Sequence, residues 1–113
     1  MPSTATDRAP PAPDTTPTVF EAIVKRLAIA ASYNRGDVTL APHIIYTRHG
    51  ELYIDAVTIE RDGKPPKEEK LGTFKLAGLA PLRLTARRFE RSALFNEQDA
   101  KYQGVALMAV DPA

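Results

Sequence analysis

The sequence contains no cysteine and no tryptophan. Without cysteine the chain can form no disulfide, no thiolate zinc site and no thiol nucleophile, and this composition fits a reducing compartment, so we expect a cytoplasmic protein. No stretch approaches the roughly 18 apolar residues that a membrane-spanning helix needs. The first residues also lack a basic patch followed by an apolar run, so neither membrane insertion nor export is predicted.

An excess of charge of one sign is also lacking. The chain has 15 Lys and Arg residues against 14 Asp and Glu residues, which gives a formal net charge of +1. This balance excludes whole-molecule attraction to nucleic acid or acidic lipid, so any electrostatic function must be local. With 113 residues, of which 43% are hydrophobic and 26% charged, the chain fits one small globular domain.

Motifs for catalysis are missing. The two histidines, His43 and His49, have no carboxylate or second imidazole at a metal-ligand spacing, and no serine lies in a Gly-x-Ser-x-Gly elbow. No glycine-rich phosphate loop is found. Asp55 and Glu60 are five residues apart and cannot share one face of a regular strand, so we expect them to be solvent charges. The sequence predicts a non-enzymatic protein without metal or cofactor.

The first 18 residues are rich in proline, serine and threonine and contain no apolar residue larger than alanine after Met1. Such a segment cannot bury enough apolar surface to offset its ordering entropy, so residues 1–18 are predicted to be a disordered tail. Thr18 and Glu21 then have the spacing of a capping box, which predicts a helix from Val19. Its expected core face consists of Val19, Phe20, Ile23, Val24 and Leu27.

Alternating apolar residues and turn signals predict an all-β remainder, with strands over 38–47, 51–60, 71–77 and 82–89 after a first strand ending at Tyr33. Pro42 is expected at an edge or a bulge. The polar segment 61–70 is expected to be an exposed loop with a net charge of +1 and no basic finger. Residues 91–103 fit a short helix or an irregular arm, and residues 105–110 favour a final strand.

A series of residues between Val19 and Phe89 has the order and spacing of a known family. It consists of Tyr33, Pro42, Gly50, the triplet Leu52-Tyr53-Ile54, Ala56, the triplet Phe74-Lys75-Leu76 and Phe89. In these positions the chain resembles the WYL domain, found in bacterial transcription regulators. The resemblance implies a mainly β fold with a short N-terminal helix, namely a small, strongly bent antiparallel barrel of the Sm-like or SH3-like type. The expected organisation is a tail over 1–18, the barrel over 19–89 and a C-terminal extension over 90–113 packed on the barrel.

WYL domains are thought to sense a ligand, in some cases single-stranded nucleic acid, through basic and aromatic positions. Three arginine positions of the family are occupied here by Val38, Gly72 and Gly78, whereas Lys75 keeps its charge. Arg83 and Arg87 lie at period two on one predicted strand face, where guanidinium groups can follow phosphates and a nearby Tyr53 can stack a base.

The candidate ligand-binding residues are Tyr53, Lys75, Arg83 and Arg87. The competing interpretation of these arginines is a solvated face, with ion pairs to Glu51, Asp55 or Glu60. The resemblance implies a regulatory module that binds a single strand or a nucleotide and acts through a DNA-binding regulator protein. The alternative is a protein interaction module that uses a sheet edge or an apolar patch.

Overall fold

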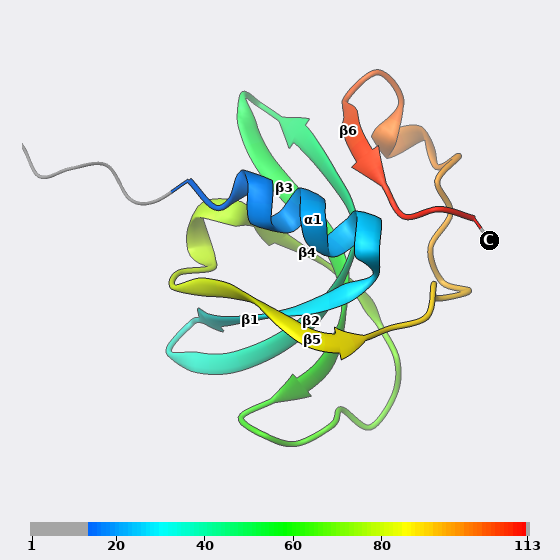
Figure 1. Ribbon diagram of the computed structural model, residues 1–113. Helices are drawn as coiled ribbons and strands as arrows, with labels where there is room; N and C mark the ends of the chain where they lie inside the picture. The colour runs from blue at the N-terminus through cyan, green and yellow to red at the C-terminus, as the bar shows by residue number, and fades with distance from the viewer. Residues whose placement is uncertain (1–13, 113) are drawn as a thin grey trace, which may run out of the picture.

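The computed structural model describes residues 14–112 as a mainly β structure with one short α-helix (Figure 1). Its regular elements, in chain order, are α1 (Thr16–Lys25), β1 (Leu27–Tyr33), β2 (Gly36–Arg48), β3 (Glu51–Arg61), β4 (Leu71–Lys75), the short 3₁₀ helix η2 (Leu76–Gly78), β5 (Leu82–Arg88), the 3₁₀ helix η3 (Ala100–Tyr102) and β6 (Ala106–Ala109). The predicted strands are therefore confirmed, with ends that differ by a few residues. No helix in the described part of the chain has the length and apolarity to cross a membrane.

Helix α1 begins earlier than the capping box predicts. Thr15 is the N-cap, and Pro17 lies in the first turn, where its missing N–H costs no hydrogen bond. The tail boundary at residue 18 was therefore wrong for residues 16–18, whereas residues 1–13 lie outside the described part of the chain. The helix buries Val19, Ala22 and Ile23 against the sheet, but Val24 is 64% exposed and does not belong to the core face.

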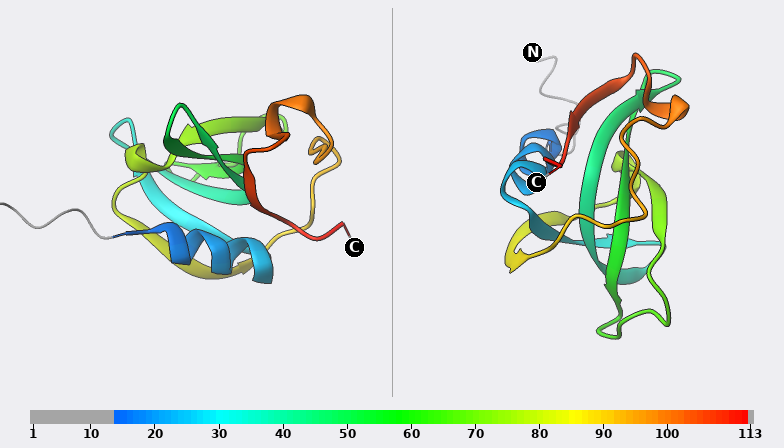
Figure 2. Two further views of the ribbon diagram at one scale, coloured as in Figure 1. Left: turned by 90° about the horizontal axis from the view of Figure 1, so that it is seen from above. Right: turned by 90° about the vertical axis from the view of Figure 1, so that its right-hand side faces the viewer.

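Strand β2 connects the two parts of the sheet. Its first half pairs with β1, its second half pairs with β6, and β3 accompanies it along nearly its whole length. The register with β3 shifts between Pro42 and Ile44, so Pro42 lies at a bulge as predicted. The views in Figure 2 show β2 and β3 as the long curved strands of the molecule, with α1 on one side.

All pairings in the sheet are antiparallel, and the strand order is β4-β3-β2-β1-β5 with β6 beside β2. Within residues 14–112, β4 and β5 end this order and are not paired with each other, so the sheet is open. The expected closure into an Sm-like or SH3-like barrel is therefore not confirmed. The mainly antiparallel β fold with a preceding helix is confirmed. The core fills the space between α1 and the sheet, with Ile23, Ile29, Leu40 and Ile54 fully buried.

The segment between β5 and β6, residues 89–105, is an irregular arm with one 3₁₀ turn, which decides between the two structures that the sequence left open. The arm crosses from the end of β5 to the start of β6 at the right of Figure 1. It buries Phe95 and Tyr102, whereas Leu94 is 49% exposed. The final strand predicted over 105–110 is confirmed as β6.

Candidate functional site

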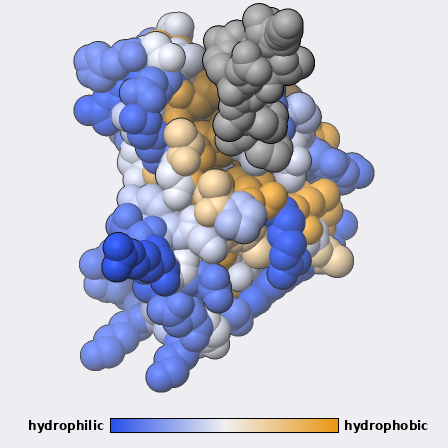
Figure 3. Space-filling view, turned by 90° about the vertical axis from the view of Figure 1, so that its left-hand side faces the viewer, coloured by the Kyte–Doolittle hydropathy of each residue, from blue (hydrophilic) through white to orange (hydrophobic). Residues whose placement is uncertain are grey.

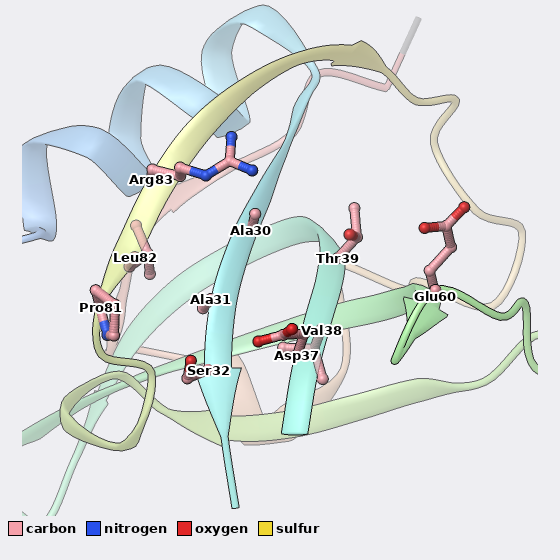
Figure 4. A pocket seen from close by; sticks show the side chains of 11 residues that line it. Ala30, Ala31, Ser32, Asp37, Val38, Thr39, Glu60, Pro81, Leu82 and Arg83 are labelled. Atoms are coloured by element: carbon pink, nitrogen blue, oxygen red, sulfur yellow. The ribbon is translucent and has the colours of Figure 1, made fainter. Parts of the chain in front are cut away.

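A trough crosses the sheet where β5, β1, β2 and β3 run side by side. Residues from all four strands meet in register, because Ala30 on β1 faces both Arg83 on β5 and Thr39 on β2, and Thr39 faces Glu60 on β3. The result is a row that runs from a guanidinium, over a methyl group and a hydroxyl, to a carboxylate. Figure 4 shows Arg83 and Glu60 at the two ends of this row, with Ala30 and Thr39 between them.

The trough encloses about 380 Å³. Three consecutive small residues of β1, Ala30, Ala31 and Ser32, line it, and Pro81 and Leu82 add apolar surface beside Arg83. The carboxylates of Asp37 and Glu60 also line it. This volume falls in the range of roughly 300–1,000 Å³ that is usual for small-molecule sites. An apolar floor with a few charged and hydroxyl groups at its rim can hold a flat or extended ligand with an anionic end.

Arg83 is the cation of the trough that no carboxylate neutralises. It is exposed, and within residues 14–112 it takes part in no ion pair. Arg87, four residues along the same strand, instead pairs with Glu60 at 3.1 Å between Nη1 and Oε2. Arg83 is therefore available to an anion, while an anion at Arg87 has to compete with Glu60.

The other two predicted residues lie elsewhere. Tyr53 on β3 and Lys75 on β4 are register partners, so the structure brings these two together. Lys75 Nζ is 2.9 Å from Oε1 of Glu51, and this partner raises the pKa of Lys75. Arg83 and Lys75 line two different cavities that share no residue, so the four predicted residues do not form one site. Of the arginine ion pairs expected with Glu51, Asp55 or Glu60, the structure has that of Arg87 with Glu60, whereas Glu51 pairs with Lys75 and Asp55 with Lys101.

Asp55 is not the solvent charge that the sequence predicts, because it is 2% exposed. Its carboxylate accepts hydrogen bonds from the hydroxyls of Tyr46 (2.7 Å), Thr73 (2.8 Å) and Tyr102, and from Lys101 Nζ (2.8 Å). Burial alone would raise the pKa of Asp55, but these four donors outweigh it and hold the pKa below its ordinary value. The partners Tyr102 and Lys101 belong to the arm, so Asp55 fastens the arm to the sheet.

His43 is a second buried polar contact between sheet and arm. It is fully buried, Nδ1 lies 2.8 Å from the carbonyl of Ala41, and Nε2 accepts the backbone N–H of Ser92 at 2.9 Å. This pattern assigns the neutral tautomer with the proton on Nδ1. Desolvation lowers the pKa of His43, and the rings of Phe89 and Phe95 lie 5.2 and 5.5 Å from its own.

Among residues 14–112, no group of three or more His, Asp or Glu side chains is placed to hold a metal ion. Comparison of the chain with protein-family models, with curated proteins and with solved structures gives no match in any of the three. The trough and its charges therefore carry the functional argument.

Proposed function

We propose that this chain is a non-enzymatic ligand-sensing module of the WYL-like type, which binds a phosphate-bearing ligand in the trough and acts through a partner regulator protein. The observation that carries the proposal is Arg83, an exposed and unpaired guanidinium at one end of a 380 Å³ trough with an apolar floor. Arginine presents a planar fork of donors that matches the oxygen atoms of a phosphate. A nucleotide, or one nucleotide unit of a single strand, fits this size, with its phosphate at Arg83 and not at the carboxylates of Asp37 and Glu60.

The strand order also supports a small-barrel relationship. A helix precedes β1, a 3₁₀ turn separates β4 from β5, and β5 returns to pair with β1. In a bent five-stranded sheet this order brings the two end strands toward each other, which is the arrangement expected of an Sm-like or SH3-like barrel. The resemblance at Pro42, Leu52-Tyr53-Ile54 and Phe74-Lys75-Leu76 gives the same expectation.

The test is equilibrium binding by fluorescence anisotropy, with a labelled 12-residue oligothymidylate and with a labelled mononucleotide. Arg83→Ala should weaken binding by about tenfold, which corresponds to one charge-assisted contact of about 1.4 kcal/mol. The matched control is Arg88→Ala, which removes the same charge from the same strand at an exposed position outside the trough. Wild-type protein that binds neither probe at low salt, or equal affinities for the two variants, would contradict the proposal.

The alternative, a protein interaction module, is favoured by a different observation. Figure 3 shows apolar side chains gathered at the centre of one face and surrounded by hydrophilic ones, and within residues 14–112 the outer edges of β4 and β5 are unpaired. Unpaired strand edges and apolar patches are surfaces that partner proteins use. This alternative becomes the better explanation if the anisotropy experiment finds no ligand for the trough.

A further inference from the structure

A second concentration of positive charge lies outside the trough, in the loop between β3 and β4. The loop begins with a tight hairpin in which Arg61 and Lys64 exchange both backbone hydrogen bonds, at 2.8 and 3.0 Å. The two residues between them, Asp62 and Gly63, both have positive φ angles, of 51° and 81°. This is the geometry of a two-residue β-turn of the mirror-image type, which holds its flanking residues in a fixed register.

This register places two cations directly opposite each other. Side chains at such a pair lie on the same side of the hairpin with Cβ atoms about 5 Å apart, and like charges in this position are destabilising. Within residues 14–112, neither Arg61 nor Lys64 forms an ion pair that would relieve the repulsion. A bound anion would reduce the repulsion between these two cations.

The acidic residues of the loop offset these cations only in part. Asp62 does not line the cavity: its Oδ1 accepts the backbone N–H of Asp37 at 3.0 Å, and its carboxylate lies beside Gly36, where Nη1 of Arg61 also lies. Glu68 lies 3.7 Å from Lys70 in a pair whose side chains are more than 70% exposed, and such a pair contributes little. The net charge of +1 counted along residues 61–70 thus hides a local excess, which is why the sequence predicted no basic finger.

The same residues surround a cavity of about 390 Å³. Four cations, Arg61, Lys64, Lys67 and Lys70, and one carboxylate, Glu68, line it together with Pro65 and Pro66. Proline fixes its φ angle, so the Pro65-Pro66 pair limits the backbone conformations of the loop. Several cations around one cavity match a ligand with closely spaced negative charges better than a ligand with a single one.

We propose that this loop cavity is a second anion site, distinct from the trough, that takes linked phosphate groups. Arg61 supplies a guanidinium fork and the lysines supply mobile point charges, the two kinds of donor that phosphate oxygens accept. The linked phosphates can come from a free oligophosphate or from the backbone of a nucleic acid strand. Gly63 lines the trough while Lys64 lines the loop cavity, so the two sites adjoin at this turn.

The first test uses inorganic tripolyphosphate with the full chain, in isothermal titration calorimetry and thermal unfolding. Tripolyphosphate should bind wild-type protein and raise its unfolding midpoint, and the double change Lys64→Gln with Lys67→Gln should weaken binding about tenfold or more. The control Arg88→Gln removes an exposed charge that lines neither cavity and should leave binding unchanged. Equal affinities of wild-type and double-variant protein would overturn the proposal.

A second variant gives two readouts that move in opposite directions. Lys64→Glu turns the like-charge pair with Arg61 into an attractive pair, so the ligand-free protein should unfold about 1–5 °C higher while tripolyphosphate binding is lost. Retention of tripolyphosphate binding by this variant would overturn the site. Arg83→Ala separates the site from the proposed trough function, because it should leave tripolyphosphate binding intact.

If Arg83→Ala abolishes tripolyphosphate binding and the lysine variants do not, the anion occupies the trough and the loop site is wrong. The source of the phosphates is decided by competition between tripolyphosphate and an unlabelled oligothymidylate. Competition that persists in Arg83→Ala, which keeps the loop cavity and weakens the trough, supports the site and assigns a nucleic acid strand to it. Tripolyphosphate binding without such competition supports the site and assigns a free oligophosphate.

Discussion

At the scale of single residues, the buried polar groups decide how the arm is held. Asp55 contacts four donors, and two of them, Lys101 and Tyr102, come from the arm some 46 residues further along the chain. His43 accepts a backbone N–H from the same arm. Because each buried polar group needs its partner, removal of either side chain leaves donors without an acceptor, at about 1–3 kcal/mol per group.

Replacement of Asp55 by alanine should therefore lower the free energy of unfolding by about 3 kcal/mol or more, since the hydroxyls of Tyr46 and Tyr102 lose their acceptor. Chemical denaturation measures the change. Glu60→Ala is the matched control, because it removes a carboxylate from the same strand whose pair with Arg87 is half exposed and contributes at most about 1 kcal/mol. Equal costs for the two variants would contradict the role given to Asp55.

His43 should make stability depend on pH. Its pKa is lowered in the folded protein, so the unfolded chain takes up a proton first, below about pH 6.5. The contribution of His43 is complete above that pH and is lost as the pH falls toward the folded pKa. His43→Gln should remove this part of the pH dependence, measured as unfolding midpoints between pH 7 and pH 5. His49→Gln, at an exposed turn position, should leave it in place.

Asp55 adds a second loss of stability at lower pH. Its folded pKa is below the ordinary value, so its contribution is present above about pH 4 and disappears as the pH falls through the folded pKa. The two groups act in the same direction in different pH windows. Acid titration of wild-type protein should show both losses, and His43→Gln should retain only the lower one.

Phe74 and Tyr53 occupy neighbouring strands but differ in burial. Phe74 is 8% exposed, and its ring packs edge-on against Tyr33 with 5.1 Å between centroids. Phe74→Ala should cost about 3–5 kcal/mol. Tyr53 is only partly buried, stacked on Tyr46 with Arg48 over its ring, so Tyr53→Ala should cost clearly less. Denaturant midpoints compare the two, and the opposite order would mean that the register of β3 and β4 is wrong.

At the scale of elements, local patterns predicted the strands well and the helix start poorly. Alternation and turn residues located β2 and β3, and the His49-Gly50 turn joins them with positive φ angles of 52° and 77°. The Thr18–Glu21 spacing suggested a cap, but hydrogen bonding favours an earlier one. Asp14 Oδ1 accepts the N–H of Thr16, and the N–H of Val19 reaches the carbonyl of Thr15. Pro17 is compatible with either start, so the sequence alone did not separate them.

The helix start can be tested by truncation. Deletion of residues 1–13 should leave the free energy of unfolding within about 0.5 kcal/mol, the usual range for neutral surface changes. Deletion of residues 1–17 removes the N-cap and the first turn and should cost about 1–2 kcal/mol. Differential scanning calorimetry compares the two. If the longer deletion is as mild as the shorter one, the helix begins at Val19 with Thr18 as its cap.

At the scale of the whole molecule, the candidate site depends on pairings that are distant in sequence. The Asn34-Arg35 turn fixes Ala30 opposite Thr39, and a hairpin of this kind is predictable from local sequence. The pairing of Ala30 with Arg83 spans more than 50 residues and has no local signal. Hence the sequence identified Arg83 as a candidate but grouped it with Lys75, and it missed Ser32, Asp37 and Thr39, which line the trough with Arg83.

The ion pairs of the candidate binding residues predict how strongly the affinity for a single strand depends on salt. Lys75 and Arg87 are held by Glu51 and Glu60, so one cation, Arg83, is left for phosphate in the trough. A single strand bound there alone should show a slope of about −0.7 in log affinity against log salt, whereas three phosphate contacts would give about −2. Anisotropy titrations from 50 to 200 mM salt measure the slope. A value near −2 would mean that the loop cavity, or the paired cations, also bind the strand.

The division of one edge of β2 between β1 and β6 has a consequence for the order of folding. β1 and β2 form a local hairpin, whereas Ile44 meets Ala109 only after a loop of about 65 residues has closed. Closure entropy grows with loop length, so the hairpin can form early and β6 has to dock late. Until then the second half of β2 lacks a neighbour on that edge, and His43 and Asp55 are without their arm partners. The amides of β6 should therefore exchange with solvent through a partial opening that leaves the rest of the sheet folded.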